Sequence, residues 1–358
     1  PRSGWAVRVQ YLKEHLQALG HDCVVLNTGV SRRIPSPEYE TVLGLGDYIR
    51  KVWRFTRAGF LPHVHVNGKS PKGLALALIA ELIGRVSGTG TVLTFHAGEQ
   101  QQYFPKSTAP AWAPLFTLLF RLPSHIICNN EAVKARICEY GIPADKITPI
   151  QAFSRQYLQF ERVSLGSALD AFWGRFDCVL FSYLNLRAGY HPETLLEAFE
   201  RLAERRADVG LVLCGVMGHP DPELAGRVRA RLEHATLRDR VHVVDDLDHD
   251  QFLTALSRAA VFVRTPPEDG VSSSVLEALA LGTPVVAAAN DSRPPGVIVY
   301  PPTDATALAA ILGDVITRRR DVSDSLPTPV IPDTLTREAA ILTESSDLQA
   351  SVRPSLDR

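Results

Sequence analysis

The stretch from Pro267 to Ala287, PEDGVSSSVLEALALGTPVVA, decides the fold of its half of the chain. An apolar run at 259–263 precedes it and predicts a buried strand. Serines at 272–274 stand where a helix should begin, and apolar residues recur at helical spacing over 275–281 before a glycine. Residues 284–288 begin another apolar strand. The stretch therefore predicts strand, loop, helix and strand, the repeating unit of a parallel α/β sheet.

The start of this predicted helix is suited to bind an anion. Backbone N–H groups at a helix N-terminus have no partner within the helix, and the helix dipole adds positive charge there. Asp269 comes just before this mouth, and Glu277 lies one turn inside the helix. An anion site flanked by two acidic side chains suits a ligand that combines a sugar, a diphosphate and a ribose.

Composition favours two domains. The chain has 358 residues, 45% of them hydrophobic, so each domain can bury a core. The formal net charge of -1 carries no basic excess, which argues against a nucleic-acid partner. The five cysteines are scattered without metal-ligand spacing, and they predict buried free thiols in a reducing, cytoplasmic compartment. The apolar stretch at 111–122 contains Pro114 and Arg121 and predicts a core helix; peripheral contact with the inner face of a membrane is the alternative.

Strands and helices alternate along the whole chain. Further strands are predicted at 23–26, 63–66, 91–95, 125–128, 146–150, 178–181, 210–214 and 241–244. Further helices are predicted at 5–19, 74–83, 131–140, 192–205, 222–233, 251–258 and 334–343. This alternation predicts an α/β fold with parallel sheets. An irregular stretch at 152–172 separates a domain at 1–155 from a second at 170–320, and a partly helical tail follows at 321–358.

With these features the chain resembles the family 4 glycosyltransferases, which have the GT-B fold. Their signature is an acid, usually Glu, then seven residues and Glu, followed by a helix and a Gly-x-Pro-Val-Val-like strand. Asp269 and Glu277 stand at the two acidic positions, with Asp at the first. The resemblance implies two Rossmann-like doubly wound domains facing across a cleft, the first on the acceptor side and the second binding the nucleotide sugar. It also implies a first strand ahead of the helix at 5–19, which the recorded sequence does not contain.

The resemblance also implies roles for individual residues. His96 stands where the family has a His followed by Gly, and it would line the pocket of the transferred sugar. Asp269 would hold hydroxyls of that sugar, and Glu277 would accept hydrogen bonds from the ribose. The diphosphate would bind to backbone N–H groups at the mouth of the helix. The residues of this mouth are Gly270, Val271, Ser272, Ser273 and Ser274.

Three further positions have two interpretations each. Gly215 would let the donor nucleotide approach the backbone, although a tight turn also explains a glycine there. His63 and His65 alternate along one predicted strand and so point the same way. A metal site would need further ligands, so packing is favoured for this pair. No metal or cofactor is expected, because the helix dipole and cationic side chains can hold the donor's charge.

The sequence departs from the family in the loop after residues 178–181. The family usually has an Arg and a Lys here that hold the donor diphosphate, whereas this chain has Asn185 and Tyr190. Arg187 in the same loop is the first candidate replacement, and Arg264 and Arg293, both near the helix mouth, are the others. The alternative is that Arg187 and Arg264 are solvated surface arginines.

These observations lead to a functional expectation. The resemblance implies a retaining, metal-independent glycosyltransferase of glycan biosynthesis that uses a nucleotide-diphosphate sugar. The acceptor would be a glycan, a lipid-linked molecule or a small molecule. The alternative is a catalytically inactive GT-B protein that binds a sugar nucleotide or a protein partner. The missing diphosphate cations favour this alternative, and the acidic pair with its helix mouth favours the enzyme.

Overall fold

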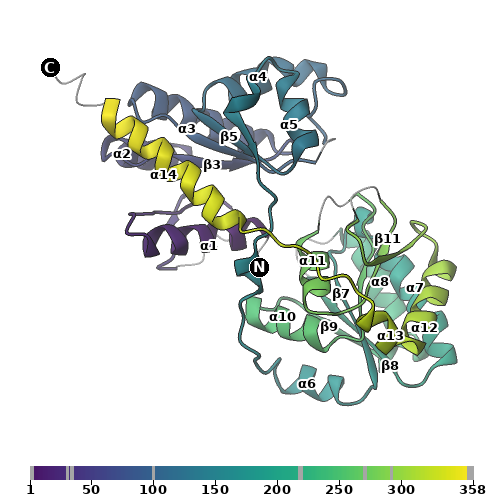
Figure 1. Ribbon diagram of the computed structural model, residues 1–358. Helices are drawn as coiled ribbons and strands as arrows, with labels where there is room; N and C mark the ends of the chain where they lie inside the picture. The colour runs from purple at the N-terminus through teal and green to yellow at the C-terminus, as the bar shows by residue number, and fades with distance from the viewer. Residues whose placement is uncertain are drawn as a thin grey trace. The chain divides into compact units, whose positions relative to one another are not determined.

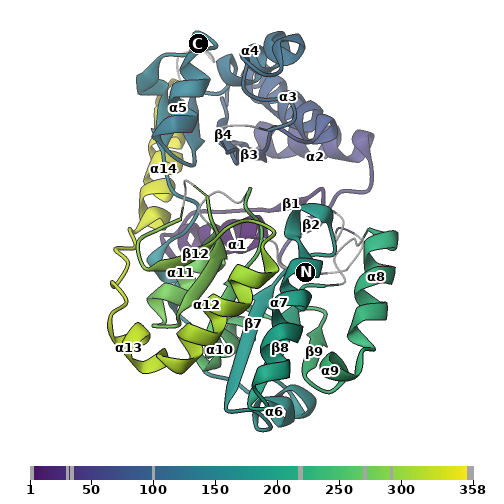
Figure 2. The same ribbon diagram turned by 90° about the vertical axis from the view of Figure 1, so that its right-hand side faces the viewer.

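The computed structural model describes residues 4–29, 32, 36–98, 101–216, 221–268, 272–290 and 293–352. The chain divides into two compact units. The C-terminal unit contains Tyr157–Ile331, and the N-terminal unit contains Trp5–Gln156 together with Pro332–Arg358. Both are α/β units with parallel strands, as Figures 1 and 2 show.

The C-terminal unit is built on a six-stranded sheet in the order β12-β11-β10-β7-β8-β9. All its neighbouring strands pair in parallel. The strands are β7 (Cys178–Tyr183), β8 (Val209–Cys214), β9 (Val241–Val244), β10 (Val261–Arg264), β11 (Val285–Ala288) and β12 (Val297–Tyr300). Sequence patterns predicted five of these strands. They missed β12, an edge strand on which only Tyr300 is fully buried.

Helices cover both faces of this sheet. One buried cluster joins α7 and α12 to the sheet, and another joins α6, α10 and α11 to it. The helices are α6 (Ser167–Trp173), α7 (Pro192–Arg205), α8 (Pro222–Leu232), α9 (Ala235–Arg238), α10 (His249–Arg258), α11 (Ser273–Ala280), α12 (Ala305–Thr317) and α13 (Arg319–Asp324), with the 3-10 helix η5 (Ala188–Tyr190). The unit is therefore doubly wound, as the sequence predicted.

The strand order reverses beside β7. From β7 the chain proceeds through β8 to β9 on one side of the sheet. It then returns to β10, on the other side of β7, and continues through β11 to β12. Doubly wound sheets bind ligands outside the carboxyl ends of the strands at this kind of switch point. The fold therefore predicts that a ligand binds beside the segments that follow β7 and β10.

The N-terminal unit has a four-stranded parallel sheet in the order β3-β4-β5-β6 and a separate parallel pair, β1-β2. Its strands are β1 (Leu26–Asn27), β2 (Glu40–Thr41), β3 (His63–Val66), β4 (Val92–Phe95), β5 (His125–Cys128) and β6 (Ile147–Pro149). Its helices are α1 (Gly4–Ala18), α2 (Leu45–Arg57), α3 (Pro71–Val86), α4 (Ala113–Arg121) and α5 (Glu131–Cys138), with η2 (Pro110–Trp112), η3 (Ala144–Lys146) and η4 (Arg155–Leu158). The strand predicted at 23–26 was wrong in its bounds, because pairing with β2 begins only at Leu26.

A helix from the end of the chain completes the N-terminal unit. The helix predicted at 334–343 is present as α14 (Thr334–Val352), drawn in yellow in Figure 1. Its Leu335, Ala339 and Leu342 are buried with Leu12 and Leu16 of α1. Burial of these side chains removes apolar surface from water and so holds the end of the chain on this unit.

Candidate functional site

The predicted binding residues that can be located lie at one edge of the C-terminal sheet. Arg187 follows β7, Gly215 follows β8, Arg264 ends β10, and the serines at 272–274 open α11. Because the strands are parallel, their carboxyl ends meet at the same edge. The residues at 269–271 (Asp269, Gly270 and Val271) lie outside the described part of the chain. Their roles stay predictions.

Arg264 spans the switch point. Its side chain is buried, and its Nη1 donates a hydrogen bond of 2.6 Å to the carbonyl oxygen of Tyr183 at the end of β7. Its Cζ lies 5.4 Å from the centroid of the Tyr190 ring, a cation–π arrangement. The hydroxyl of Thr265 donates to the carbonyl oxygen of Tyr190. A buried guanidinium therefore lies beside Tyr190, the residue at the family's usual lysine position.

Glu277 is a buried carboxyl group without a hydrogen-bond partner in the described ranges. It lies on α11 and is 8% exposed. Burial raises its pKa from 4.5 to about 8. Among the described residues, none donates a hydrogen bond to it. Burying a carboxyl group without a hydrogen-bond partner costs free energy. Hydroxyl groups of a ligand could provide such partners and so stabilise Glu277.

The start of α11 keeps backbone donors available. Ser272 is the N-cap residue, and its side chain does not cap the helix. Its hydroxyl oxygen lies 3.0 Å from that of Ser274. The N–H groups of Val275 and Leu276 donate to the Ser272 carbonyl, whereas those of Ser273 and Ser274 donate to no residue in the described ranges. This is the pattern of a helix mouth that can bind an anion.

Gly215 has a packing reason to be a glycine. Its φ is +80°, and a Cβ atom there would lie 2.6 Å from Cε2 of Tyr183. The turn after β8 therefore requires a residue without a side chain, whether or not a nucleotide approaches it. The following residues, 217–220, lie outside the described ranges. A nucleotide-binding role for Gly215 stays a prediction.

Arg293 holds the two loops that flank α11 and β11. Its Nη2 donates to the carbonyl oxygen of Pro266 at 2.6 Å, and its Nε donates to that of Ala288 at 3.0 Å. Asn290 adds a hydrogen bond of 3.0 Å from its Nδ2 to the carbonyl oxygen of Pro267. These contacts fix the backbone that follows β10, where the acidic loop begins.

His96 lies in the N-terminal unit, directly after β4. Its Nε2 is 2.9 Å from Nδ1 of His65 on β3, and Nε2 of His63 is 2.7 Å from Oγ1 of Thr94. Burial lowers the pKa of His96 well below its usual 6.5 and lowers the pKa of His63 to about 3. At neutral pH these imidazoles are uncharged. A neutral imidazole can donate one hydrogen bond to a ligand and accept one from it. These imidazoles are poorly suited to take up a proton.

The structure adds to this cluster two residues that the sequence did not single out. Glu338 of α14 approaches His63 and His65 so that one ligand atom from each of the three lies within 4.8 Å of the others. This set could ligate a metal by its chemistry. However, Nε of Arg8 lies 2.8 Å from Oε2 of Glu338, and both side chains are almost fully buried. The guanidinium already balances the carboxylate and would repel a divalent cation, so the cluster is charge-balanced without a metal.

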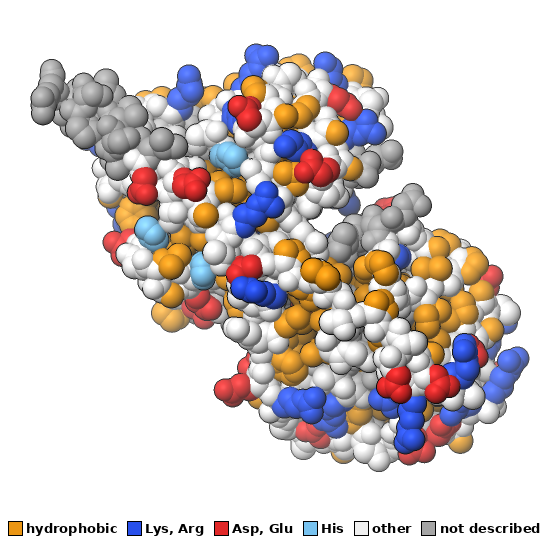
Figure 3. Space-filling view, in the orientation of Figure 1, with side chains coloured by type: hydrophobic (Ala, Val, Ile, Leu, Met, Phe, Trp, Pro, Cys, Tyr) orange, Lys and Arg blue, Asp and Glu red, His pale blue; other side chains and the backbone are white. Residues whose placement is uncertain are grey.

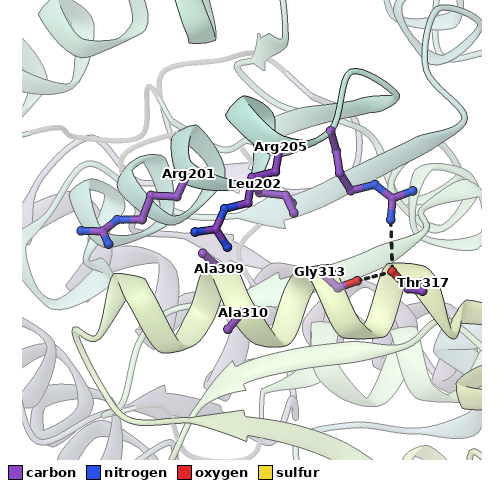
Figure 4. A pocket seen from close by; sticks show the side chains of 8 residues that line it. Arg201, Leu202, Arg205, Ala309, Ala310, Gly313 and Thr317 are labelled. Atoms are coloured by element: carbon purple, nitrogen blue, oxygen red, sulfur yellow. Dashed lines mark hydrogen bonds between the residues drawn. The ribbon is translucent and has the colours of Figure 1, made fainter.

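A surface hollow of about 320 Å³ lies between α7 and α12, on the outside of the C-terminal unit (Figure 4). Arg201 and Arg205 line one side of it, and Gly313 and Thr317 line the other. Because α7 leads into the start of β8, its C-terminal end lies toward the amino ends of the strands. The hollow is therefore remote from the switch point.

On the face shown in Figure 3, acidic and basic side chains are interspersed.

Two family models match the chain. The model described as "Glycosyltransferase Family 4" matches residues 2–152, and that described as "Glycosyl transferases group 1" matches residues 177–319. The chain belongs to the family 4, or group 1, glycosyltransferases. No curated protein matches this glycosyltransferase in sequence.

Solved structures share the fold of this glycosyltransferase. A glycosyltransferase from Rickettsia africae ESF-5 matches with a TM-score of 0.65 and 15% identity over 96% of each chain. Anabaena Alr3699/HepE, solved with UDP-glucose, matches with a TM-score of 0.59 and 18% identity over 86% of this chain and 82% of that one. A UDP-N-acetylglucosamine 2-epimerase matches with 0.62 and 14%, over 93% and 91%. At these identities the likeness shows the GT-B fold alone.

No helix in the described ranges is long and apolar enough to cross a membrane.

Proposed function

We propose that the protein is a retaining glycosyltransferase that moves a sugar from a nucleotide-diphosphate sugar to an acceptor hydroxyl. Its family supports sugar transfer, and the related fold of Alr3699/HepE was solved with a donor of this class. The observation that carries the proposal is the buried carboxyl group of Glu277, which has no partner among the described residues. A ribose offers two neighbouring hydroxyl donors to such a group.

The diphosphate would bind at the switch point. The N–H groups of Ser273 and Ser274 would donate to one phosphate at the start of α11. Arg264 would provide the cation that Asn185 and Tyr190 do not. The diphosphate gains negative charge as the glycosidic bond breaks, so these donors would stabilise the transition state more than the bound donor.

The transferred sugar would meet Asp269 and His96. Asp269 would accept hydrogen bonds from the hydroxyls of this sugar. His96, uncharged at neutral pH, would donate a hydrogen bond to the sugar or accept one from it. The acceptor oxygen would attack on the side from which the diphosphate leaves, and the acceptor proton would pass to the leaving phosphate. This route retains the anomeric configuration and requires no protein base. The acceptor would be a glycan, a lipid-linked molecule or a small molecule.

Donor binding is tested by calorimetry with a panel of nucleotide-diphosphate sugars. Glu277→Ala should weaken binding of the donor by roughly 1–3 kcal/mol, because two ribose hydroxyls each lose a hydrogen-bond partner. Glu161→Ala, at an exposed position of the same unit, is the matched control and should bind normally. Equal affinity of Glu277→Ala and the wild type would refute the assignment to the ribose.

An inactive protein that binds a sugar nucleotide is the second candidate. The observation that favours it is the absence of a basic residue at positions 185 and 190. The buried guanidinium of Arg264 beside Tyr190 opposes it, because a cation is present where the loop lacks one. The two candidates differ in turnover: the inactive protein would bind the donor and release no nucleoside diphosphate.

A further inference from the structure

Three arginines line the surface hollow between α7 and α12. Arg201, Arg205 and Arg206 contribute their side chains from α7 and its end, and Thr317 contributes a hydroxyl group from α12 (Figure 4). Among the described residues that line the hollow, none is acidic. Its volume of about 320 Å³ lies within the range of small-molecule sites. The hollow therefore has both the charge and the size to bind a small anion.

Arg205 is the arginine of this group without a counter-charge. Its side chain is exposed, and it forms no ion pair with any residue that the structure describes. Arg201 lies one turn earlier on the same face of α7, because residues four positions apart are neighbours on a helix. Like charges at this spacing destabilise a helix. An anion bound between the two guanidinium groups would offset this repulsion.

The other two arginines are held in place by the protein. Nη2 of Arg201 donates a hydrogen bond of 2.7 Å to Glu197. Nε and Nη2 of Arg206 donate to Asp208 at 3.0 and 2.7 Å, and its Nη1 donates to the hydroxyl of Thr317 at 3.3 Å. Groups that are already positioned lose less conformational freedom when a ligand binds. These two side chains therefore form a preorganised rim around the hollow.

Small residues of α12 form the opposite side of the hollow. They are Ala309, Ala310 and Gly313. A Cβ atom at Gly313 would have its nearest contact at 3.8 Å, with Cδ1 of Leu202, so packing does not require a glycine there. The absence of larger side chains leaves space for a ligand beneath the arginines.

A second hollow, of about 650 Å³, adjoins the first at Thr317. Three consecutive arginines at 318–320 line it, together with Asp321 and Asp324. The last two arginines, Arg319 and Arg320, form no ion pair within the described ranges. Guanidinium groups without counter-charges thus lie on both sides of Thr317. This arrangement suits an extended anion with several charged groups better than a single ion.

We propose that the two hollows together bind an oligophosphate chain, either free or as part of a nucleotide. A guanidinium group can bind two phosphate oxygens at once, and successive phosphates would match arginines placed on both sides of Thr317. The hollows lie toward the amino ends of the strands, whereas the switch point lies at their carboxyl ends. The proposal therefore concerns a second site, and it holds whichever donor the protein uses.

Calorimetry with tripolyphosphate tests this site. The wild type should bind tripolyphosphate, and it should bind orthophosphate at least tenfold more weakly. Arg205→Glu should weaken the binding of tripolyphosphate about tenfold or more, because a carboxylate replaces a guanidinium without a counter-charge. Arg162→Glu, at an exposed arginine ahead of α6 in the same unit, is the matched control and should bind as the wild type does.

Two further variants separate this site from the switch point and from a general effect of charge. Gly313→Leu fills the first hollow and leaves every arginine in place, and leucine favours a helix more than glycine does. This variant should also weaken binding about tenfold. Arg264→Ala, at the switch point, should keep the binding that Arg205→Glu loses.

Four results would overturn the proposal: no binding by the wild type, an equal loss in Arg162→Glu, unchanged binding in Gly313→Leu, or a loss in Arg264→Ala alone. The last would place the anion at the switch point. Adenosine triphosphate distinguishes the two sources of the chain. Binding tighter than that of tripolyphosphate, and lost in Arg205→Glu, would support the site with a nucleotide as its ligand. Equal or weaker binding, with the same loss, would support it with a free chain.

Discussion

Replacing Glu277 by Gln should stabilise the ligand-free protein at neutral pH while it weakens donor binding. The carboxyl group is buried, and burial raises its pKa from 4.5 to about 8. In the unfolded chain the same group ionises near its ordinary value. Between these two values the unfolded state is ionised and the folded state keeps its proton. The free energy of unfolding of the wild type therefore falls as pH rises through this window, and it levels off above about pH 8.

The size of the effect follows from this window. A pKa difference of one unit corresponds to about 1.4 kcal/mol, so the penalty at pH 7 is about 3 kcal/mol. Gln does not titrate and removes the penalty. The variant and the wild type should have equal stability below about pH 3.5, where Glu277 is protonated in both the folded and the unfolded state. At pH 7 the variant should be more stable by about 3 kcal/mol, or several degrees in the unfolding temperature.

Urea unfolding at a series of pH values measures this difference. Glu161→Gln, at an exposed position, should follow the wild type at every pH and controls for the loss of one charge. Calorimetry of Glu277→Gln with nucleotide sugars should show weakened binding. Two results would contradict this expectation: a Glu277→Gln variant less stable than the wild type at pH 8, or a difference that does not change with pH. The first would mean that the carboxylate has a stabilising partner within the protein, and the second that folding leaves its pKa unchanged.

Three other changes test the remaining assignments. Arg264→Ala should lower the transfer rate by on the order of a hundredfold, measured beside Arg187→Ala, because a positioned cation is removed from the leaving group. Near-normal rates in both variants would place the cation elsewhere. Asp269→Asn should reduce kcat far more than nucleoside diphosphate affinity; equal losses would move Asp269 to the nucleotide site. Transfer should survive excess chelator, and a loss of activity that manganese restores would contradict metal independence.

The sequence predicted most of the fold because parallel strands and their helices leave local patterns. The bounds of β3, β5, β9 and α7 agree with their apolar runs and helical spacing. The missed elements include helices α2, α6 and α12 and strand β12. Half of the apolar residues of α2 face solvent, and β12 is an edge strand. In half-exposed elements such as α2 and β12, the spacing of apolar residues does not mark one buried face, so the sequence does not reveal the element.

The site was predictable where chain order places residues at strand ends. The positions of Ser272 and Arg264 follow from where α11 begins and β10 ends. The contact of Arg264 with Tyr190, and that of Arg8 with Glu338, depend on packing between distant segments. The spacing of residues along the chain does not indicate contacts between distant segments, so only a structure could show them.

Sugar transfer is the function proposed for the buried carboxyl group of Glu277 and the buried guanidinium of Arg264. The most direct measurement is the release of nucleoside diphosphate when the wild type and Arg264→Ala are incubated with a panel of nucleotide-diphosphate sugars. The wild type should turn over at least one donor, and Arg264→Ala should bind this donor but release its product about a hundredfold more slowly. Donor binding by the wild type without release of nucleoside diphosphate from any sugar in the panel would contradict a role in sugar transfer.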